Sequence, residues 1–242
     1  MKSNTENNSF KDGISDGLPI CIGYLAVSFA FGISAVELGL SVWEVLLISM
    51  FNLTSAGQVA GAPIIATGGS FFQLGLTQLV INSRYSLMSV SLSQRLGNTV
   101  RLRDRFLIAF GNTDEVFGVS TARGTMLGRK YFYGLILPPF LGWSLGTLLG
   151  AALGKILPVI ITTALGVAIY AMFVAIVVPE MKKNIKTMLA VIVAIALSSV
   201  FYYTPVLNDI ESGFVVVICA VAVSLLFAII APIQDEKEDE EE

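Results

Sequence analysis

The chain is divided into long apolar segments joined by short polar ones, and this pattern limits the fold more than any other feature. Eight such segments lie at about residues 18–36, 42–66, 71–93, 106–122, 131–153, 158–179, 187–203 and 213–232. A helix needs about 20 apolar residues to cross the roughly 30 Å hydrocarbon core of a bilayer. Because 55% of the 242 residues are hydrophobic and the mean hydropathy is +0.77, the sequence predicts an all-α integral membrane protein. We expect a bundle of about seven or eight transmembrane helices, some of them broken or re-entrant.

The polar ends of the chain set the expected domain boundaries. Residues 1–16 form a polar N-terminal segment without the apolar core and small-residue cleavage site of a signal peptide, so none is expected. Residues 17–232 are predicted to form a single transmembrane domain. Residues 233–242 contain the acidic run QDEKEDEEE, which indicates a solvated, disordered C-terminal tail.

Rare residue types argue against several functional classes. Histidine is absent, which removes the Ser-His and Cys-His routes to nucleophilic catalysis and the usual zinc ligands, so we expect no enzyme, metal or cofactor. Cys21 and Cys219 lie in apolar segments and are expected to be buried free thiols. The net charge of −3 does not favour nucleic acid. No G-x-x-x-x-G-K-[ST] loop occurs, so ATP would have to act through another subunit.

The distribution of lysine and arginine predicts the orientation, because these residues favour the cytoplasmic side in short loops. If all eight segments cross, nine basic residues lie on the side of both termini and five on the other, which places both termini in the cytoplasm. The nine are Lys2, Lys11, Arg123, Arg129, Lys130, Lys182, Lys183, Lys186 and Lys237, and the five are Arg95, Arg101, Arg103, Arg105 and Lys155. The arginines at 95–105 then lie outside, against the rule. A segment that enters the membrane and returns would change this assignment, and 42–66 is the clearest candidate.

Residues 51–69 of that segment read FNLTSAGQVAGAPIIATGG. Glycine and proline at membrane depth free backbone groups that hydrocarbon cannot satisfy. The first interpretation is a broken helix that lines a substrate path. The second is a glycine-rich face for tight helix packing. A similar choice concerns the glycines at 142, 146, 150 and 154, which predict close packing either within the chain or at a subunit interface.

The segment 71–93 contains an arginine, Arg84, at membrane depth. At 100° per residue, the polar and small residues of this segment, Arg84 included, fall on two opposite faces of a helix. One face holds Gln73, Thr77, Arg84, Met88 and Ser91, and the other holds Gly75, Gln78, Asn82, Ser86, Ser89 and Ser93. We therefore expect this helix to lie inside the bundle, with helices or a cavity on both sides. An arginine at this depth costs about 2.5 to 3.5 kcal/mol on insertion scales, so it should have a partner or face water.

Asp114 and Glu115 are the candidate partners of Arg84. Arg84 lies 11 residues before Arg95, about 16 Å along a helix, and Asp114 lies 9 residues after Arg105, about 14 Å. In an antiparallel pair of helices the two charges reach similar depth. The pair either fixes helix register alone or handles substrate or protons. A zwitterion suits the second role, with its carboxylate near Arg84 and its ammonium near Asp114 or Glu115.

Five stretches carry a wider pattern: GYLAVSFAFG at 23–32, VINSRYSLMSVSL at 80–92, NTDEVFGV at 112–119, GWSLGTLLGAALG at 142–154 and AMFVAIVVP at 171–179. Together they resemble the large subunit of the AzlC-type branched-chain amino acid permeases, over most of the chain. The family's F-A-G-A-A-Q appears here as LTSAGQ, with Gln58 kept. Ala26 and Ser28 stand where the family has proline and glycine, and an aspartate expected near Gly166 is absent.

The resemblance implies export of branched-chain amino acids such as leucine, isoleucine or valine across the bacterial cytoplasmic (inner) membrane by a multi-pass protein. It also implies the proton as coupling ion and a small AzlD-like membrane subunit as partner. The residues expected along the substrate or proton path are Arg84, Asp114, Glu115, Asn82, Tyr85, Gln58, Asn112, Ser89 and Tyr24. A passive channel, or a transporter of another small zwitterionic or polar solute, is the alternative.

Overall fold

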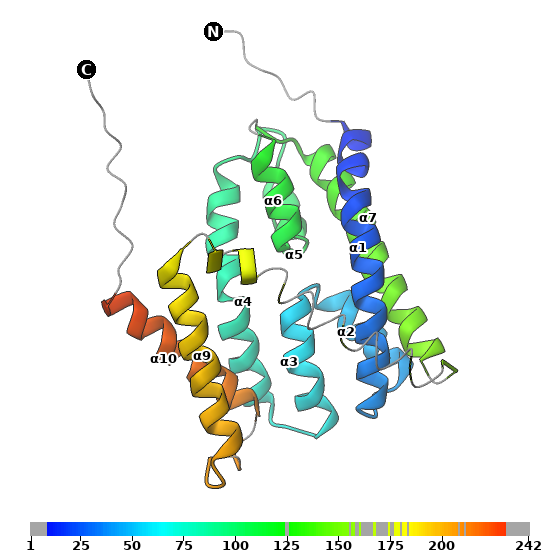
Figure 1. Cartoon of the computed structure of the whole chain (residues 1–242). Helices are drawn as coiled ribbons and strands as arrows, with labels where there is room; N and C mark the ends of the chain where they lie inside the picture. The colour runs from blue at the N-terminus through cyan, green and yellow to red at the C-terminus, as the bar shows by residue number, and fades with distance from the viewer. Residues whose placement is uncertain are drawn as a thin grey trace, which may run out of the picture. The chain divides into compact units, whose positions relative to one another are not determined.

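The computed structural model describes residues 9–123, 126–154, 156–157, 184–207, 209–210 and 212–230, together with isolated positions between 160 and 182. The chain divides into two compact units, residues 1–172 and 173–242. The first contains α1 (Phe10–Glu37), α2 (Val42–Phe51), α3 (Ser55–Ala66), α4 (Phe71–Ser93), α5 (Leu102–Phe110), α6 (Asp114–Ala122) and α7 (Arg129–Leu153) (Figure 1). The second contains α9 (Ile185–Tyr203) and α10 (Ser212–Ile230), which pack against each other. The predicted segment 158–179 lies almost wholly outside the described residues.

The predicted all-α membrane fold is confirmed. Within the described ranges there is no β-strand, and four helices are long and apolar enough to cross a membrane: α1, α7, α9 and residues 213–230 of α10. The helix α4 is also long, with 23 residues, but it carries more polar side chains than these four helices and is not one of them. The proposed boundaries at residues 16 and 232 remain a prediction, since nothing in the structure tests them.

The helices α1 and α7 pack along most of their length. Gly17 contacts Leu135 near the start of both helices, and Gly142 contacts Cys21 further along, so the two helices run parallel. A Cβ atom at Gly142 would lie 2.6 Å from the Cys21 carbonyl oxygen. Only glycine allows so close an approach of two backbones. The predicted glycine-rich face of residues 142–154 therefore serves packing within the chain.

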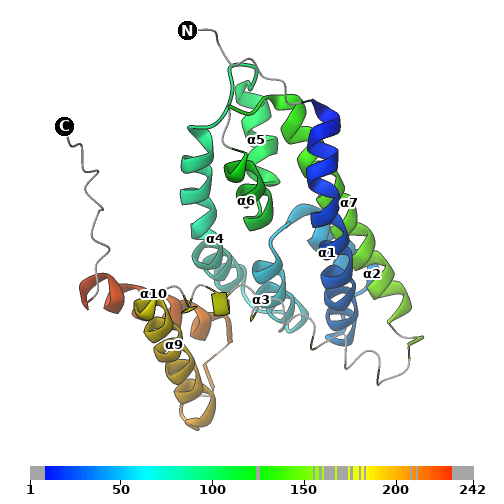
Figure 2. The same ribbon diagram turned by 45° about the horizontal axis from the view of Figure 1, so that its top comes forward.

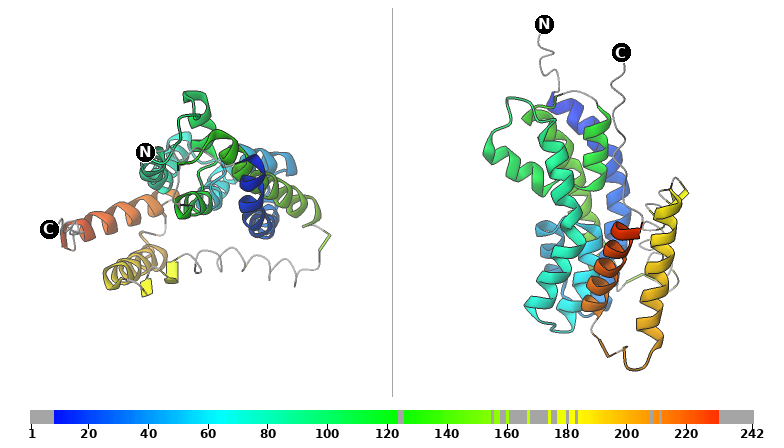
Figure 3. Two further views of the ribbon diagram at one scale, coloured as in Figure 1. Left: turned by 90° about the horizontal axis from the view of Figure 1, so that it is seen from above. Right: turned by 90° about the vertical axis from the view of Figure 1, so that its left-hand side faces the viewer.

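Two apolar segments of the first unit are each broken into a pair of short helices. The helices α2, α3, α5 and α6 have 10, 12, 9 and 9 residues, which span only about 13 to 18 Å each at 1.5 Å per residue. None can cross a membrane alone. Figure 1 shows α2 and α3 in the half of this unit where α4 begins, and α5 and α6 in the half where α4 ends. The view in Figure 2 and the right panel of Figure 3 show the same separation.

Each pair is thus a re-entrant hairpin, and the two enter from opposite ends of the unit. We name them the α2–α3 hairpin and the α5–α6 hairpin. The order long helix, then hairpin, occurs twice, in α1 to α3 and in α4 to α6, with opposite direction. This is the arrangement of an inverted repeat. The sequences at the two breaks also agree in part, since Phe51 and Thr54 correspond to Phe110 and Thr113.

The break in segment 42–66 was predicted, although it lies at residues 52–54 and Pro63 is inside α3. The sequence reading of 106–122 as one continuous segment is wrong. There, Gly111 ends α5 and the Thr113 side chain accepts a hydrogen bond from the Val116 N–H, which starts a new helix. Because α5 ends and α6 starts within residues 106–122, the chain reverses direction there.

The second break changes the predicted topology. Leu96 pairs with Leu127, and Arg95 Nη1 donates to the Thr121 carbonyl oxygen at 2.8 Å, so the connections before α5 and after α6 lie together. An ion pair of Arg123 with Asp16 joins them to the first turns of α1. The prediction that the arginines at 95–105 lie on the opposite side from residues 123–130 is therefore wrong, because α5 and α6 do not cross.

Candidate functional site

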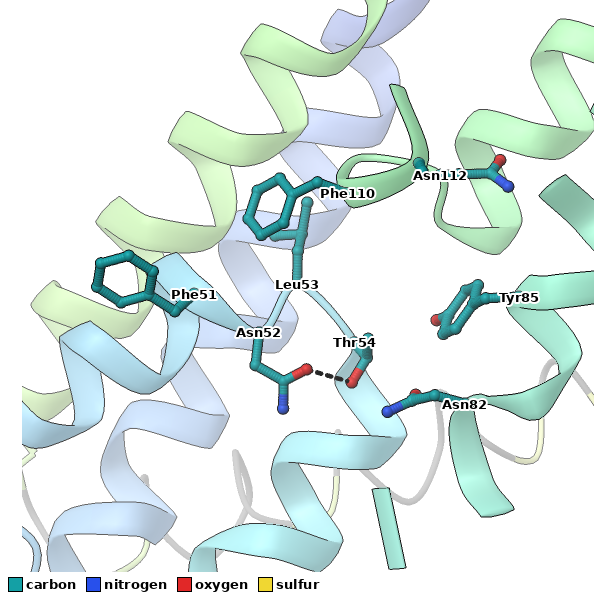
Figure 4. Close-up of a pocket in the computed structure, with 9 residues that line it drawn as sticks. Phe51, Asn52, Leu53, Thr54, Asn82, Tyr85, Phe110 and Asn112 are labelled. Atoms are coloured by element: carbon teal, nitrogen blue, oxygen red, sulfur yellow. Dashed lines mark hydrogen bonds between the residues drawn. The ribbon is translucent and has the colours of Figure 1, made fainter. Parts of the chain in front are cut away.

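The tips of the two hairpins lie together beside α4 and line an open pocket of about 210 Å³. Its lining comes from the α2–α3 break, the α5–α6 break and the middle of α4: Phe51, Asn52, Leu53, Thr54, Asn82, Tyr85, Ala109, Phe110 and Asn112. Figure 4 shows the α2–α3 break and Phe110 on one side, and Asn82, Tyr85 and Asn112 on the other. The first side combines three apolar side chains, Phe51, Leu53 and Phe110, with the polar Asn52 and Thr54, and the other side is polar. Asn82, Tyr85 and Asn112 were predicted as path residues from the sequence.

Gln78 of α4 holds the α2–α3 break in place. Its Nε2 donates to the Gly57 carbonyl oxygen at 2.7 Å, and its Oε1 accepts from Asn52 Nδ2 at 3.3 Å and Asn82 Nδ2 at 3.0 Å. Thr54 Oγ1 donates to Asn52 Oδ1 at 3.0 Å. Gln78 was not among the predicted path residues. The signal that could have found it is its position one helical turn before Asn82, on the same face.

Two acceptors at the pocket have no hydrogen-bond partner among the described residues, Asn82 Oδ1 and Asn112 Oδ1. The Asn112 side chain is 2% exposed, and its Nδ2 donates to Ser89 Oγ at 3.3 Å. A buried polar group left unpaired costs about 1 to 3 kcal/mol. Such groups beside a pocket indicate that something else, a ligand or water, satisfies them. Asn112 and Ala109 also line a neighbouring pocket of about 200 Å³, together with Ser89.

The predicted pairing of Arg84 with Asp114 is confirmed. Arg84 Nη1 lies 2.7 Å from Asp114 Oδ2, Nη2 donates to the Tyr85 hydroxyl at 3.2 Å, and the guanidinium carbon lies 4.9 Å from the Tyr85 ring centre. The two charged side chains are 38% and 35% exposed, so the ion pair is only partly buried. Neither lines the pocket. Tyr85 lines the pocket and contacts Arg84, so it connects the ion pair to the pocket.

Glu115 points to a different helix. Its Oε2 accepts a short hydrogen bond from the Tyr24 hydroxyl of α1. Tyr24 is buried, and its ring lies edge-on to Trp143 of α7 with centroids 5.0 Å apart. The adjacent carboxylates of Asp114 and Glu115 therefore bind separate elements, α4 and α1. Over the described residues no three His, Cys, Asp or Glu side chains gather as metal ligands would.

Gln58 lies away from the pocket. It is 1% exposed, its Nε2 donates to Ser49 Oγ at 2.8 Å, and Ser49 Oγ lies 2.8 Å from Thr147 Oγ1. These contacts join α3, α2 and α7. They are contacts of helix packing, and a place for Gln58 in a transport path stays a prediction.

The helix α4 is less enclosed than predicted. Gln73 and Thr77 are buried, and Gln78, Asn82 and Ser89 are half-buried. The exposed residues of the same helix are Phe71, Phe72, Gly75, Leu79, Ser83, Ser86, Leu87, Val90, Ser91 and Ser93. The prediction of contacts on both polar faces is therefore wrong for Gly75, Ser86, Ser91 and Ser93. Gly75, Ser86 and Ser93 lie on a third, outward side together with leucine and valine, and Ser91 is exposed near the end of the helix.

Comparison with known proteins identifies a family and several membrane proteins as relatives. A family model described as AzlC protein matches residues 19–157, which contain every element that lines the pocket. The chain is 33% identical to the inner membrane protein YgaZ of Escherichia coli over 58% of this chain, and the match covers 59% of the length of YgaZ. It is 31% identical to an uncharacterized membrane protein of Archaeoglobus fulgidus over 75% of this chain and 80% of that protein. An uncharacterized membrane protein of Helicobacter pylori is 25% identical over 58% of this chain and 62% of that protein. No solved structure matches. The chain belongs to the AzlC family of membrane proteins.

Proposed function

We propose that this chain is the large subunit of a secondary transporter that exports branched-chain amino acids, driven by the proton gradient and working with a small AzlD-like membrane subunit. One observation carries the proposal. Two re-entrant hairpins meet tip to tip at a pocket lined by both apolar and polar side chains. Discontinuous helices that meet at a midplane site are the recurring substrate site of secondary transporters.

The chemistry of the pocket supports a small aliphatic amino acid. Phe51, Leu53 and Phe110 provide an apolar wall for an aliphatic side chain. The amides of Asn82 and Asn112 provide polar groups for a charged backbone. A volume of about 210 Å³ is below the roughly 300–1,000 Å³ of pockets for drug-sized ligands, so the pocket suits only a small solute.

The carboxylates at the start of α6 support proton coupling. Ionisable residues within membrane segments often form proton relays. A proton on Asp114 would break its ion pair with Arg84, and a proton on Glu115 would change its hydrogen bond with Tyr24. Either event alters the contacts that connect the α5–α6 hairpin to α4 or α1.

The charge distribution supports one orientation. The connection at 94–101 and the described residues Arg123 and 126–128 lie at the same end as the start of α1. That end collects Lys11, Arg95, Arg101, Arg103, Arg105, Arg123, Arg129 and Lys130. The positive-inside rule then gives a cytoplasmic N-terminus. We place the protein in the bacterial inner membrane on this ground and on its likeness to the E. coli protein.

The test is efflux from proteoliposomes loaded with labelled leucine, isoleucine or valine, with and without an imposed pH gradient. We expect gradient-driven efflux when the small subunit is included. Full efflux by the chain alone would remove the partner from the proposal. Efflux that ignores the pH gradient would favour a passive channel, and efflux of unrelated polar solutes alone would exclude the proposed substrate.

A further inference from the structure

We propose that the side chain of Phe110 sets the size limit of the transported amino acid, because it separates the pocket from an apolar groove beside α7. This inference rests on the proposed function and deepens it, since it concerns the same pocket. It names the residue whose removal extends the substrates from branched-chain amino acids to larger apolar ones.

The groove has a volume of about 300 Å³ and is lined by residues of α1, α5 and α7. We name it the α5–α7 groove. Besides Phe110, its lining includes Leu107 of α5 and Ile136, Leu137 and Phe140 of α7. Tyr133 also lines it, but the hydroxyl of Tyr133 already donates to Asp104. The groove therefore offers a surface made almost entirely of carbon, which suits an apolar side chain.

Phe110 belongs to both cavities. Among the described residues, it alone lines the pocket as well as the α5–α7 groove. Its ring centre lies 6.3 Å from that of Phe140 in the groove, and Figure 4 shows it on the same side of the pocket as Leu53. The backbone next to it lies close to α7, since a Cβ atom at Gly111 would be 2.4 Å from Ile136 Cγ2. The Phe110 side chain is thus the boundary between the two cavities.

This boundary limits the length of a bound apolar chain. The pocket alone has about 210 Å³, which must hold the amino and carboxylate groups of the substrate as well as its side chain. Each methylene that reaches apolar surface tightens binding, until the next one has to displace the Phe110 ring. Beyond that length, binding weakens. Without the ring, the chain continues into the α5–α7 groove.

The experiment measures this length directly. The full chain is reconstituted with its small subunit, and unlabelled amino acids compete with labelled leucine in exchange across the vesicle membrane. The competitors are norvaline, norleucine and their next two longer unbranched homologues, together with phenylalanine. For the wild type we expect the inhibition constant to fall about fourfold for each methylene and then to rise at least about tenfold at the first homologue that meets the ring.

Three variants locate the limit. Phe110→Ala joins the two cavities, so the limit should move to a longer homologue and phenylalanine should gain about tenfold or more relative to leucine. Phe110→Trp should move the limit to a shorter homologue. Phe51→Ala is the matched control, because Phe51 holds the corresponding position in the α2–α3 hairpin and lines the pocket but not the groove. Its loss should weaken all homologues by a similar factor and leave the limit in place.

The outcomes separate the two proposals. If leucine, isoleucine and valine are neither exported nor able to compete, the proposed function fails. If leucine is exported but Phe110→Ala keeps the wild-type limit, or if Phe51→Ala moves the limit equally, the role of Phe110 is refuted while the function stands. The wild-type series is decisive even when no variant folds, since inhibition that strengthens through the longest homologue would show that no ring limits the pocket.

Discussion

The α2–α3 and α5–α6 hairpins use the same backbone arrangement but differ in charge at their tips. At α3 the N-cap side chain is turned away and no carboxylate is present. At α6 the Thr113 side chain caps the helix, and Asp114 and Glu115 occupy its first turn. The same partial positive charge is thus left open in one hairpin and neutralised in the other. We infer that the first hairpin binds substrate and the second transmits the proton.

The largest effect is expected from removing the ion pair that joins the α5–α6 hairpin to α4. Asp114→Leu leaves Arg84 without its ion-pair partner at membrane depth, so export should fall by about a hundredfold and the protein should become less stable. The double variant Arg84→Leu with Asp114→Leu should regain thermal stability and insertion but not export. Export is measured by efflux, and stability by thermal melting of the purified variants. Near-normal export by the double variant would mean that the pair only fixes the packing of α6 against α4.

The next effect separates coupling from binding. Glu115→Gln keeps a hydrogen-bonding side chain beside Tyr24 but cannot titrate. Gradient-driven efflux should fall about tenfold, while exchange of labelled for unlabelled leucine without a gradient should continue. Glu44→Gln is the matched control in the other hairpin, because glutamine preserves the capping box with Ser41 there. An equal loss in both variants would argue against a special role for Glu115.

A moderate effect is expected from removing the hydrogen bonds that hold the α2–α3 hairpin against α4. Gln78→Leu removes the hydrogen bonds to Gly57, Asn52 and Asn82, and leaves the amide nitrogens of Asn52 and Asn82 without their acceptor. We expect KM for leucine to rise about three- to tenfold with little change in kcat, since the tip is displaced but the coupling residues are not. Ser83→Ala, at an exposed position on the same helix, serves as control. A loss confined to kcat would contradict this assignment.

The smallest effect tests the capping difference itself. Thr113→Ala removes the cap of α6 and should lower the free energy of unfolding by about 1 kcal/mol. Thr54→Ala removes no cap and should cost less. Thermal melting of the two variants in the same detergent compares them. Equal losses would mean that Thr54 does cap α3, and the open N-terminus would have to be abandoned.

Much of this arrangement could be predicted from particular residues. The pairing of Arg84 with Asp114 was predicted from depth alone, and it holds because α5 still leads inward from the membrane surface before the chain turns. The break in segment 42–66 was predicted from its glycine, proline and polar residues. Both predictions rest on local sequence and on the cost of polar groups in hydrocarbon.

The second break was missed because residues 106–122 contain no proline and remain apolar on average. A stronger signal was present in Thr113, Asp114 and Glu115, since a threonine followed by acidic residues is typical of a helix start. The burial of Gln58 against Ser49 and Thr147, and the unpaired oxygens of Asn82 and Asn112, could not be predicted. These depend on side chains brought together from three or more helices.

The most direct test of two opposed hairpins is cysteine labelling in cells. Cys21 and Cys219 are first replaced by serine, and single cysteines are then placed at Leu38, Thr67, Asn98 and Met126, all of them exposed. An impermeant reagent added outside should label Leu38→Cys and Thr67→Cys, whereas Asn98→Cys and Met126→Cys should react only after the cells are opened. Labelling of Asn98→Cys and Met126→Cys from opposite sides would mean that residues 102–122 cross the membrane, and the account of two hairpins meeting at one pocket would be wrong.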